Sequence, residues 1–316
     1  MFRAGSVVAA IALGSVVALS APAQASVPAD GSAGSCGTWT SSVVTTGAGM
    51  LENLEFDGNG SMVLSQSALI GPGALLKVAP DGTRTTLVGD VTGPGGLVAR
   101  EGSVYFTTGN STVSGLFGIA DGSLRKVDVA DGSVTTIADG LVMPNGLVQL
   151  DDNRFLTART LARPGLTVVN SDGSSSIVRE DLGTVDGLAR SGSTIYVSTT
   201  FDMVTAVHIL DANDLGGPVR TITLPGFGPA NMADDLTVGP DGALYVAFNA
   251  GGKVVRVDPD SGSSCEIASG LPFTSAVKFG AGPGWDPNAL YTTGFLGDRK
   301  SRRVGKECRS RWSPYH

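Results

Sequence analysis

The chain has 316 residues, of which 41% are hydrophobic and 16% charged, so it can bury a sizeable core and is not a disordered protein. Its formal net charge of −7 gives no electrostatic support to nucleic-acid binding. Glycine occurs 45 times without a three-residue period, which excludes collagen and favours short strands joined by tight turns.

The N-terminal segment, residues 1–25, has the pattern of a secretory signal peptide. Arg3 is positively charged, residues 7–19 are apolar, and Ala23 and Ala25 fit a small-residue cleavage site. We expect this segment to be removed and the protein to be secreted, with no membrane partner. A retained anchor is the alternative, although the apolar run is short for a membrane span.

One pattern recurs along the chain: a marker residue, a small residue, an apolar residue, a turn, and then a strand rich in aromatic and β-branched residues. Successive markers are 43, 50, 41, 48 and 41 residues apart. The six copies begin at Glu52, Gly95, Asn145, Asp186, Asp234 and Ser275. A bulky residue follows each marker, and these are Met62, Tyr105, Phe155, Tyr196, Tyr245 and, after an insertion, Tyr291.

The repeat predicts an all-β fold, a six-bladed β-propeller spanning residues 26–297. Each unit holds three to four short strands with Asp-Gly turns, and four-stranded units with a period near 45 are typical of propeller blades. We expect the bulky residues to pack between blades. Residues 38–47 are expected to complete the last blade, which we nevertheless expect to remain incomplete with an exposed edge, because the sixth copy stops at residue 297.

The C-terminal segment, residues 298–316, differs from the rest of the chain. It holds seven basic and two acidic residues, whereas the remainder has 15 basic and 27 acidic residues. A solvated tail or an anion-binding arm would explain such a run. The string also resembles an in-frame translation of a sequencing-adapter oligonucleotide. We therefore expect it to be non-native and assign it no function.

Cysteine usage suggests one disulfide. Cys308 lies in the basic tail, which leaves Cys36 and Cys265. Two cysteines in an exported chain are expected to pair, and the bond would lie near the seam of the propeller. Two unpaired thiols are the alternative.

The markers predict a metal site, because equivalent positions of a repeat lie at equivalent places around the axis. Four of them carry oxygen ligands: Glu52, Asn145, Asp186 and Asp234. Three carboxylates this close either raise their pKa values or hold a cation, and oxygen ligands suit Ca²⁺ or Mg²⁺, with calcium favoured. The alternative is that these residues are turn formers that bind backbone N–H groups.

The motifs that begin at these markers resemble a known family. An early Glu52, the PNGL string at Asn145 and the blade-5 motif at Asp234 are similar to the SMP-30/gluconolactonase group of propellers, to which strictosidine synthase-like proteins and paraoxonases are related. The resemblance implies a divalent metal in the channel mouth and a substrate contact by Asn145. It departs at Asp186, where those lactonases use Asn.

A closer similarity is to the ScyD/ScyE-type proteins of bacteria, through the strings PNGLV, DDLTVGPDGALYVA and GGKVVRVDPDSG. That resemblance implies an exported propeller without an assigned reaction. We expect a binding module for a small molecule or an extracellular partner, with a metal-dependent lactonase or ester hydrolase as the alternative. No catalytic residue is assigned, because no general base stands out beside the markers and no Ser-His-Asp set can be assembled.

Overall fold

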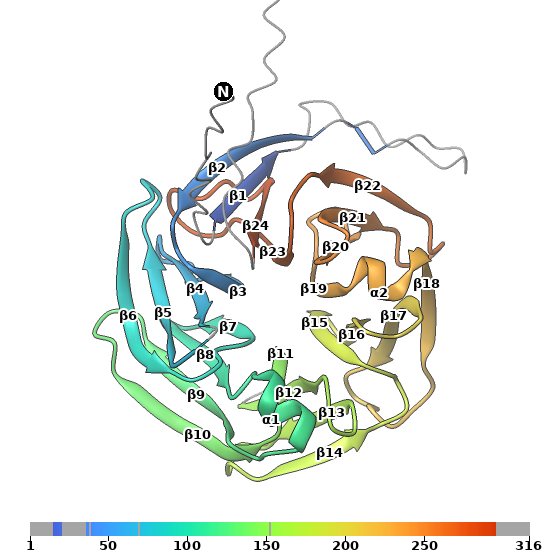
Figure 1. Ribbon diagram of the computed structural model, residues 1–316, viewed down its shortest axis with the longest axis horizontal. Coiled ribbons are helices and arrows are strands. Elements are labelled where there is room, and N and C mark those ends of the chain that lie inside the picture. The colour runs from blue at the N-terminus through green and yellow to red at the C-terminus, as the bar shows by residue number, and fades with distance from the viewer. Residues whose placement is uncertain (1–14, 21–35, 38, 69, 152, 295–316) are drawn as a thin grey trace, which may run out of the picture.

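The computed structural model describes residues 15–20, 36–37, 39–68, 70–151 and 153–294. In this part of the chain, six four-stranded antiparallel sheets are arranged in a ring around a central axis (Figure 1). The prediction of an all-β, six-bladed propeller is therefore confirmed.

The innermost strand of each blade lies next to this axis, and we call the space that the six inner strands surround the channel of the propeller (Figure 1). From the inner to the outer strand, the blades are β3 (Met50–Phe56), β4 (Met62–Ser67), β5 (Gly73–Val78) and β6 (Arg84–Val91); β7 (Leu97–Arg100), β8 (Ser103–Thr108), β9 (Gly122–Asp128) and β10 (Val134–Leu141); β11 (Pro144–Asp151), β12 (Arg154–Arg159), β13 (Gly165–Val169) and β14 (Ser175–Arg179); β15 (Val185–Ser191), β16 (Thr194–Thr199), β17 (Val204–Asp211) and β18 (Arg220–Phe227); β19 (Ala233–Val238), β20 (Leu244–Phe248), β21 (Lys253–Val257) and β22 (Ser264–Ser269); and β23 (Thr274–Phe279), β24 (Ala289–Gly294), β1 (Ser15–Ser20) and β2 (Thr40–Thr46).

The sixth blade is closed by the N-terminal part of the chain. The strand expected at residues 38–47 is β2, at the outer edge, and β1 pairs with both β2 and β24. The expectation of an incomplete last blade is wrong, because residues 15–20 supply the missing strand. Val16 and Leu19 of that strand are fully buried, so the strand contributes to the core.

Strand β1 lies inside the segment expected to be a signal peptide. A run of small, apolar and β-branched residues suits either a leader or a buried strand, so its composition does not distinguish the two. Removal of residues 1–25 would take β1 away and leave β24 and β2 without their shared neighbour. A cleaved leader and a retained β1 are therefore mutually exclusive.

The apolar core of the described residues is divided into six clusters, each between two consecutive blades. The bulky residues of the repeat lie in these clusters, as expected. Tyr105 of blade 2 packs on Phe155 of blade 3 with ring centroids 4.6 Å apart, and Tyr291 of blade 6 packs on Phe56 of blade 1 at 5.1 Å. Each blade thus buries its faces against its neighbours, which explains why the ring must close.

Two short helices, α1 (Thr112–Phe117) and α2 (Gly228–Asn231), were not predicted from the sequence. Helix α1 is capped at both ends. The side chain of Ser111 accepts a hydrogen bond from the N–H of Ser114, and Gly118 ends the helix in the left-handed region at φ 63°. None of the helices in the described part of the chain has the length and apolar character needed to cross a membrane.

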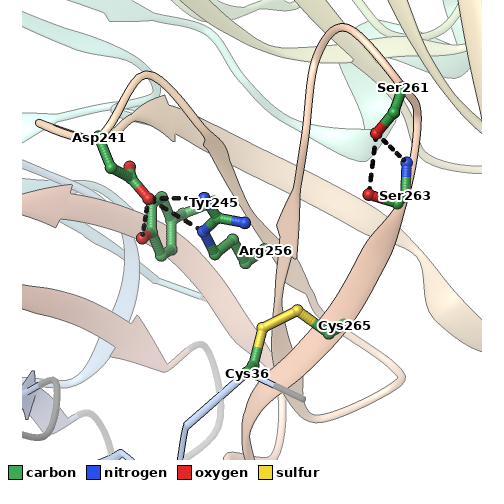
Figure 2. Close-up of a disulfide and its surroundings, with 7 residues drawn as sticks. All are labelled: Cys36, Asp241, Tyr245, Arg256, Ser261, Ser263 and Cys265. Atoms are coloured by element: carbon green, nitrogen blue, oxygen red, sulfur yellow. Dashed lines mark hydrogen bonds and ion pairs between the residues drawn. A yellow bond between two sulfur atoms is a disulfide. The ribbon is translucent and has the colours of Figure 1, made fainter. Parts of the chain in front are cut away.

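A disulfide joins Cys36 to Cys265, with their Cα atoms 5.8 Å apart (Figure 2). It ties the outer strand of blade 5, β22, to the segment that leads into β2 of blade 6. Beside it, the carboxylate of Asp241 accepts hydrogen bonds from the hydroxyl of Tyr245 and from the guanidinium of Arg256 (Figure 2). The bond therefore lies at the seam where the N-terminal strands close the ring.

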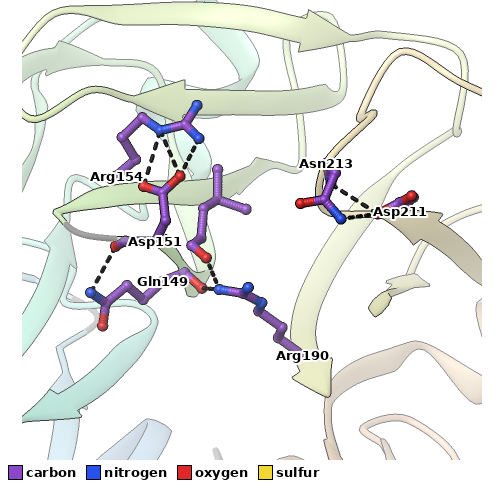
Figure 3. Close-up of polar contacts among 7 residues, drawn as sticks. Gln149, Asp151, Arg154, Arg190, Asp211 and Asn213 are labelled. Carbon is purple, nitrogen blue, oxygen red and sulfur yellow. Dashed lines mark hydrogen bonds and ion pairs between the residues drawn. The ribbon is translucent and has the colours of Figure 1, made fainter. Parts of the chain in front are cut away.

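At the end of the channel remote from the markers, polar contacts link blades 3 and 4 (Figure 3). Asp151 forms an ion pair with Arg154 across the β11–β12 hairpin. Arg190, at the end of β15, donates to the carbonyl oxygen of Gln149 at 2.7 Å and to that of Leu150. These contacts fix the exposed ends of the two inner strands and show no convergence of ligating groups.

Candidate functional site

The predicted marker residues lie at β-bulges in the inner strands. In five blades the pairing register shifts at the marker, so that the marker falls outside the regular ladder. The shifts fall between Leu51 and Asn53 in β3, Pro144 and Leu147 in β11, Val185 and Leu188 in β15, Ala233 and Leu236 in β19, and Thr274 and Val277 in β23. Because a bulge interrupts side-chain alternation and bends the strand, it can redirect the marker side chain toward the channel.

Hydrogen bonds between blades hold these bulges in place. The carbonyl oxygen of Asn145 accepts from the Thr107 hydroxyl at 3.2 Å and from the N–H of Gly96 at 3.1 Å, both in blade 2. In blade 6, the hydroxyl of Ser275 donates to the carbonyl oxygen of Leu51 in blade 1 at 2.7 Å. The side chain of the blade 6 marker thus joins two blades through a backbone carbonyl group.

The glycine after the marker permits close approach of neighbouring bulges. A Cβ on Gly146 would lie 2.3 Å from the carbonyl oxygen of Asp186 and 2.8 Å from the nitrogen of Leu188. Gly187 is similarly confined, since its Cβ would lie 2.6 Å from the carbonyl oxygen of Asp234. The NGL and DGL strings are therefore explained by packing between inner strands as well as by turn formation.

We expect Gly146→Ala to lower the free energy of unfolding by about 1 to 3 kcal/mol, because the added methyl group forces two backbones apart. The measurement is chemical denaturation followed by circular dichroism. Gly89→Ala is the matched control, since a Cβ there meets nothing within 4 Å. Equal stability of the two variants would contradict the packing role of Gly146.

The four ligand-type markers lie together at one end of the channel. The side-chain amide of Asn145 donates to Oδ1 of Asp186. A hydrogen bond from the same amide also lowers the pKa of Glu52. Asn145 and Asp186 are buried, whereas Glu52 and Asp234 are partly exposed. Asn145 of blade 3 thus links the carboxylates of blades 1 and 4.

A second set of polar residues, absent from the sequence prediction, surrounds the carboxylates. These residues share one repeat position, the first or second residue after the second strand of a blade, and that shared position is the signal that could have revealed them. Asn110 donates to Oε1 of Glu52 at 2.9 Å, Thr160 to Oδ1 of Asp186 at 3.4 Å, and Asn249 to Oδ2 of Asp234 at 2.9 Å. Each of these three carboxylates therefore receives a hydrogen bond from a neighbouring loop.

Burial raises the pKa of all three carboxyl groups. For Glu52 the pKa is raised to about 7 by desolvation, against the hydrogen bond from Asn110 and with the negative charge of Asp235 adding to the rise. Desolvation raises the pKa of Asp186 well above its usual range, and the charges of Glu52 and Asp235 raise it further. The pKa of Asp234 is also raised well above its usual range, first by desolvation and then by the negative charges of Asp186 and Glu52. The groups are thus close enough to repel one another.

Asp235, beside the Asp234 marker, belongs to a further polar layer that the sequence analysis also missed. Its Oδ2 accepts from Nδ2 of Asn53 at 3.2 Å. Desolvation raises the pKa of Asp235 to about 6, and the positive charge of Lys278 opposes that rise. Lys278 itself pairs with Glu55 at 3.2 Å. This layer connects blades 5, 6 and 1 and partly neutralises the negative charge at that end of the channel.

The donor chemistry of the mouth fits a hard divalent cation. Its potential ligands are carboxylate and amide oxygens, without histidine or cysteine, and the positive end of the Asn145 amide dipole now lies between two carboxylates. As the side chains stand, the described residues contain no group of three or more His, Cys, Asp or Glu arranged to hold a metal ion. Binding an ion therefore requires side chains of the mouth to rotate.

Solved structures with this architecture include enzymes and binding proteins. A gluconolactonase from Xanthomonas campestris is 19% identical over 78% of this chain and 86% of its own, with a TM-score of 0.59. Regucalcin from Agrobacterium tumefaciens, described as a calcium-binding protein, is 15% identical over 79% and 92%, with a TM-score of 0.57. A chain of a nidogen/laminin complex is 15% identical over 81% and 92%, with a TM-score of 0.59.

These similarities define the class of the protein, a six-bladed β-propeller with the fold of gluconolactonase and regucalcin. At such identities they show the fold alone, and one fold can support unrelated functions. Neither a protein-family model nor a curated protein sequence matches the chain. The residues at the channel mouth are therefore the features of this protein that bear on its function.

Proposed function

We propose that this protein binds a small molecule at the channel mouth through a divalent cation, with calcium favoured. Glu52, Asp186 and Asp234 would hold the cation, and Asn145 would help to hold it or contact the ligand. We also propose that the protein is a propeller of the ScyD/ScyE type, and the support for this is the similarity of its sequence strings to those proteins.

The observation that carries the proposal is the mutual repulsion of three carboxylates in one poorly solvated place. Each of Glu52, Asp186 and Asp234 has a raised pKa, caused first by desolvation. A bound cation would offset both the lost hydration and the repulsion, and it would supply a positive centre for a polar ligand. The asparagine and threonine donors around the mouth would keep the carboxylates oriented.

The test is calcium binding by isothermal titration calorimetry to full-length protein freed of metal with EDTA. We expect Glu52→Gln and Asp234→Asn each to weaken calcium binding at least about tenfold, because each removes a charged ligand. Asp131→Asn is the control, since Asp131 lies exposed in the β9–β10 hairpin. Absence of calcium binding to the wild-type protein, or unchanged affinity in both variants, would refute the proposal.

The second candidate is a metal-dependent lactonase, and the specific observation in its favour is the fold that the chain shares with a gluconolactonase, with Glu52, Asp186 and Asp234 together at the channel mouth. A cation held by these carboxylates could polarise a carbonyl group and orient water for hydrolysis. The same variants assayed on lactones and aryl esters distinguish the candidates. Turnover that is lost in Glu52→Gln selects the lactonase, whereas calcium binding without turnover on any substrate selects the binding module.

We also propose that the protein is exported. The disulfide between Cys36 and Cys265 supports an oxidising compartment, because disulfides rarely persist in the cytosol. Export with cleavage after residue 25 would remove β1 from blade 6, and export with a retained N-terminal segment would keep it.

A further inference from the structure

The exposed apolar side chains of the protein gather at the mouth end of the propeller. The inner strands begin at this end and the second strands end there, so the connections that leave a second strand, or that lead to the next blade, surround the mouth. All but three of the large apolar side chains that are exposed in the described residues lie in or beside these connections. The exceptions are Val43, Val134 and Ile177, in the outer strands β2, β10 and β14. We call the surface formed by residues 70–72, 109–121, 200–204, 227–232 and 270–273 the mouth face.

Two groups of side chains make up most of the apolar surface of the mouth face. Helix α1 presents Leu116 and Phe117, which are 65% and 77% exposed. Beside α2, Met203 is 68% and Phe227 53% exposed, and the N–H of Gly228 donates to the carbonyl oxygen of Met203 at 3.0 Å. Figure 1 shows the two helices on different sides of the channel. Single exposed apolar residues are ordinary on a protein surface, but such a concentration on one face marks an interaction site.

The apolar groups border the carboxylates of the mouth. Asn110, which donates to Oε1 of Glu52 at 2.9 Å, lies two residues before the start of α1. Helix α2 ends at Asn231, three residues before the marker Asp234. A partner that covers the apolar groups on both sides would therefore also cover the acidic centre between them.

The mouth face is acidic and has no basic residue of its own. Its five segments contain neither Lys nor Arg, and their charged residues are Asp121 and Asp202. At its centre, Glu52 and Asp234 are partly exposed. Charge complementarity therefore calls for a positively charged partner. An anionic lipid bilayer is disfavoured, because it attracts surfaces that carry Lys and Arg.

We propose that the mouth face is a docking surface for a protein partner, bound through a segment that carries basic residues beside apolar ones. The basic groups would face Glu52 and Asp234, and the apolar side chains would pack on α1 and on Met203 and Phe227. Aromatic residues and methionine are enriched in protein–protein interfaces, and these groups belong to connections of different blades, which a single small molecule would not cover. The proposal goes beyond the cation-dependent site for a small molecule.

The probe is a short synthetic peptide of leucine and lysine whose leucines lie on one face of a helix. It is titrated by isothermal titration calorimetry against full-length protein in EDTA at pH 8, above the pKa of about 7 of Glu52. We expect a Kd of about 100 μM or below. Peptides with glutamate in place of lysine, or serine in place of leucine, should bind at least about tenfold more weakly. Equal binding of either comparison peptide, or no saturable binding of the probe, would overturn the proposal.

Two double variants test the two apolar groups. Leu116→Ser with Phe117→Ser, and Met203→Ser with Phe227→Ser, should each weaken binding of the probe at least about fivefold, because each removes exposed apolar contacts.

The matched control is Val134→Ser with Ile177→Ser, which makes the same kind of change on outer strands and should alter the affinity less than about twofold. Unchanged affinity in either mouth-face variant, or an equal loss in the control, would overturn the proposal. Residues 298–316 are basic and present in every variant, so any competition from them is common to all measurements.

Calcium titrations separate this proposal from the proposed cation site. The Leu116→Ser, Phe117→Ser variant should keep the calcium affinity of the wild-type protein, whereas Glu52→Gln should weaken binding of both calcium and the probe. Binding of the probe in EDTA does not depend on calcium, so either proposal can fail without the other. Sedimentation with vesicles of phosphatidylcholine and phosphatidylglycerol is the last arm. Vesicle binding that is lost in both mouth-face variants, without binding of the probe, would assign the face to a membrane and overturn the proposal.

Discussion

Replacing Cys36 and Cys265 together by serine is expected to lower the free energy of unfolding by about 3 to 5 kcal/mol. The disulfide spans 229 residues of sequence, and a bond that closes so long a loop strongly restricts the unfolded chain. In the folded protein it joins blade 5 to the segment entering blade 6, so its loss also loosens the seam. Urea denaturation measures the difference.

Two controls accompany this prediction. Cys308→Ser removes the remaining cysteine of the chain, which lies outside the described residues, and should leave the stability unchanged. Wild-type protein treated with a reductant should unfold at the same urea concentration as the double variant. If the double variant is as stable as the wild-type protein, the bond contributes nothing to closure of the ring.

Metal-free protein is expected to be more stable at pH 5 than at pH 7.5. The pKa of Glu52 is raised from 4.5 to about 7 and that of Asp235 from 3.8 to about 6, so between these limits the folded state binds more protons than the unfolded state. Stability must then fall as the pH rises through this window. Glu52 alone contributes on the order of 2 to 3 kcal/mol at about 1.4 kcal/mol per pKa unit.

The measurement is thermal denaturation in EDTA, where we expect the melting temperature to fall by several degrees from pH 5 to pH 7.5. Glu52→Gln should flatten this dependence, and Asp131→Asn should not. His208, whose pKa is lowered by burial, acts in the opposite direction, because its neutral form is favoured in the folded state as the pH rises. A melting temperature that increases steadily from pH 5 to pH 7.5 would show that the carboxylates do not control stability.

The fold and the four markers could be predicted because both depend on the blade repeat. A regular spacing in sequence becomes a regular placement around the axis, so the repeat alone predicts that Glu52, Asn145, Asp186 and Asp234 lie at one end of the channel. The bulges that redirect them were not evident, because a one-residue shift of register leaves little trace in the hydrophobic pattern.

The donors around the carboxylates were harder to predict. The donors Asn110, Thr160 and Asn249 follow the second strand of their blades by one or two residues, and each lies in a loop whose length varies between blades, so their alignment is not visible in the sequence.

The closure of blade 6 has a consequence for the order in which the protein acquires its structure. In blade 6, β1 pairs with β2 and with β24, and β24 pairs with β23. The first two described strands of the chain therefore cannot complete their sheet until the last two have been synthesised. Until then, two apolar blade faces lack a neighbour, and contacts of such large sequence separation form slowly. Closure of the ring is therefore expected only after β24 has left the ribosome, with the open intermediate as the species most exposed to aggregation.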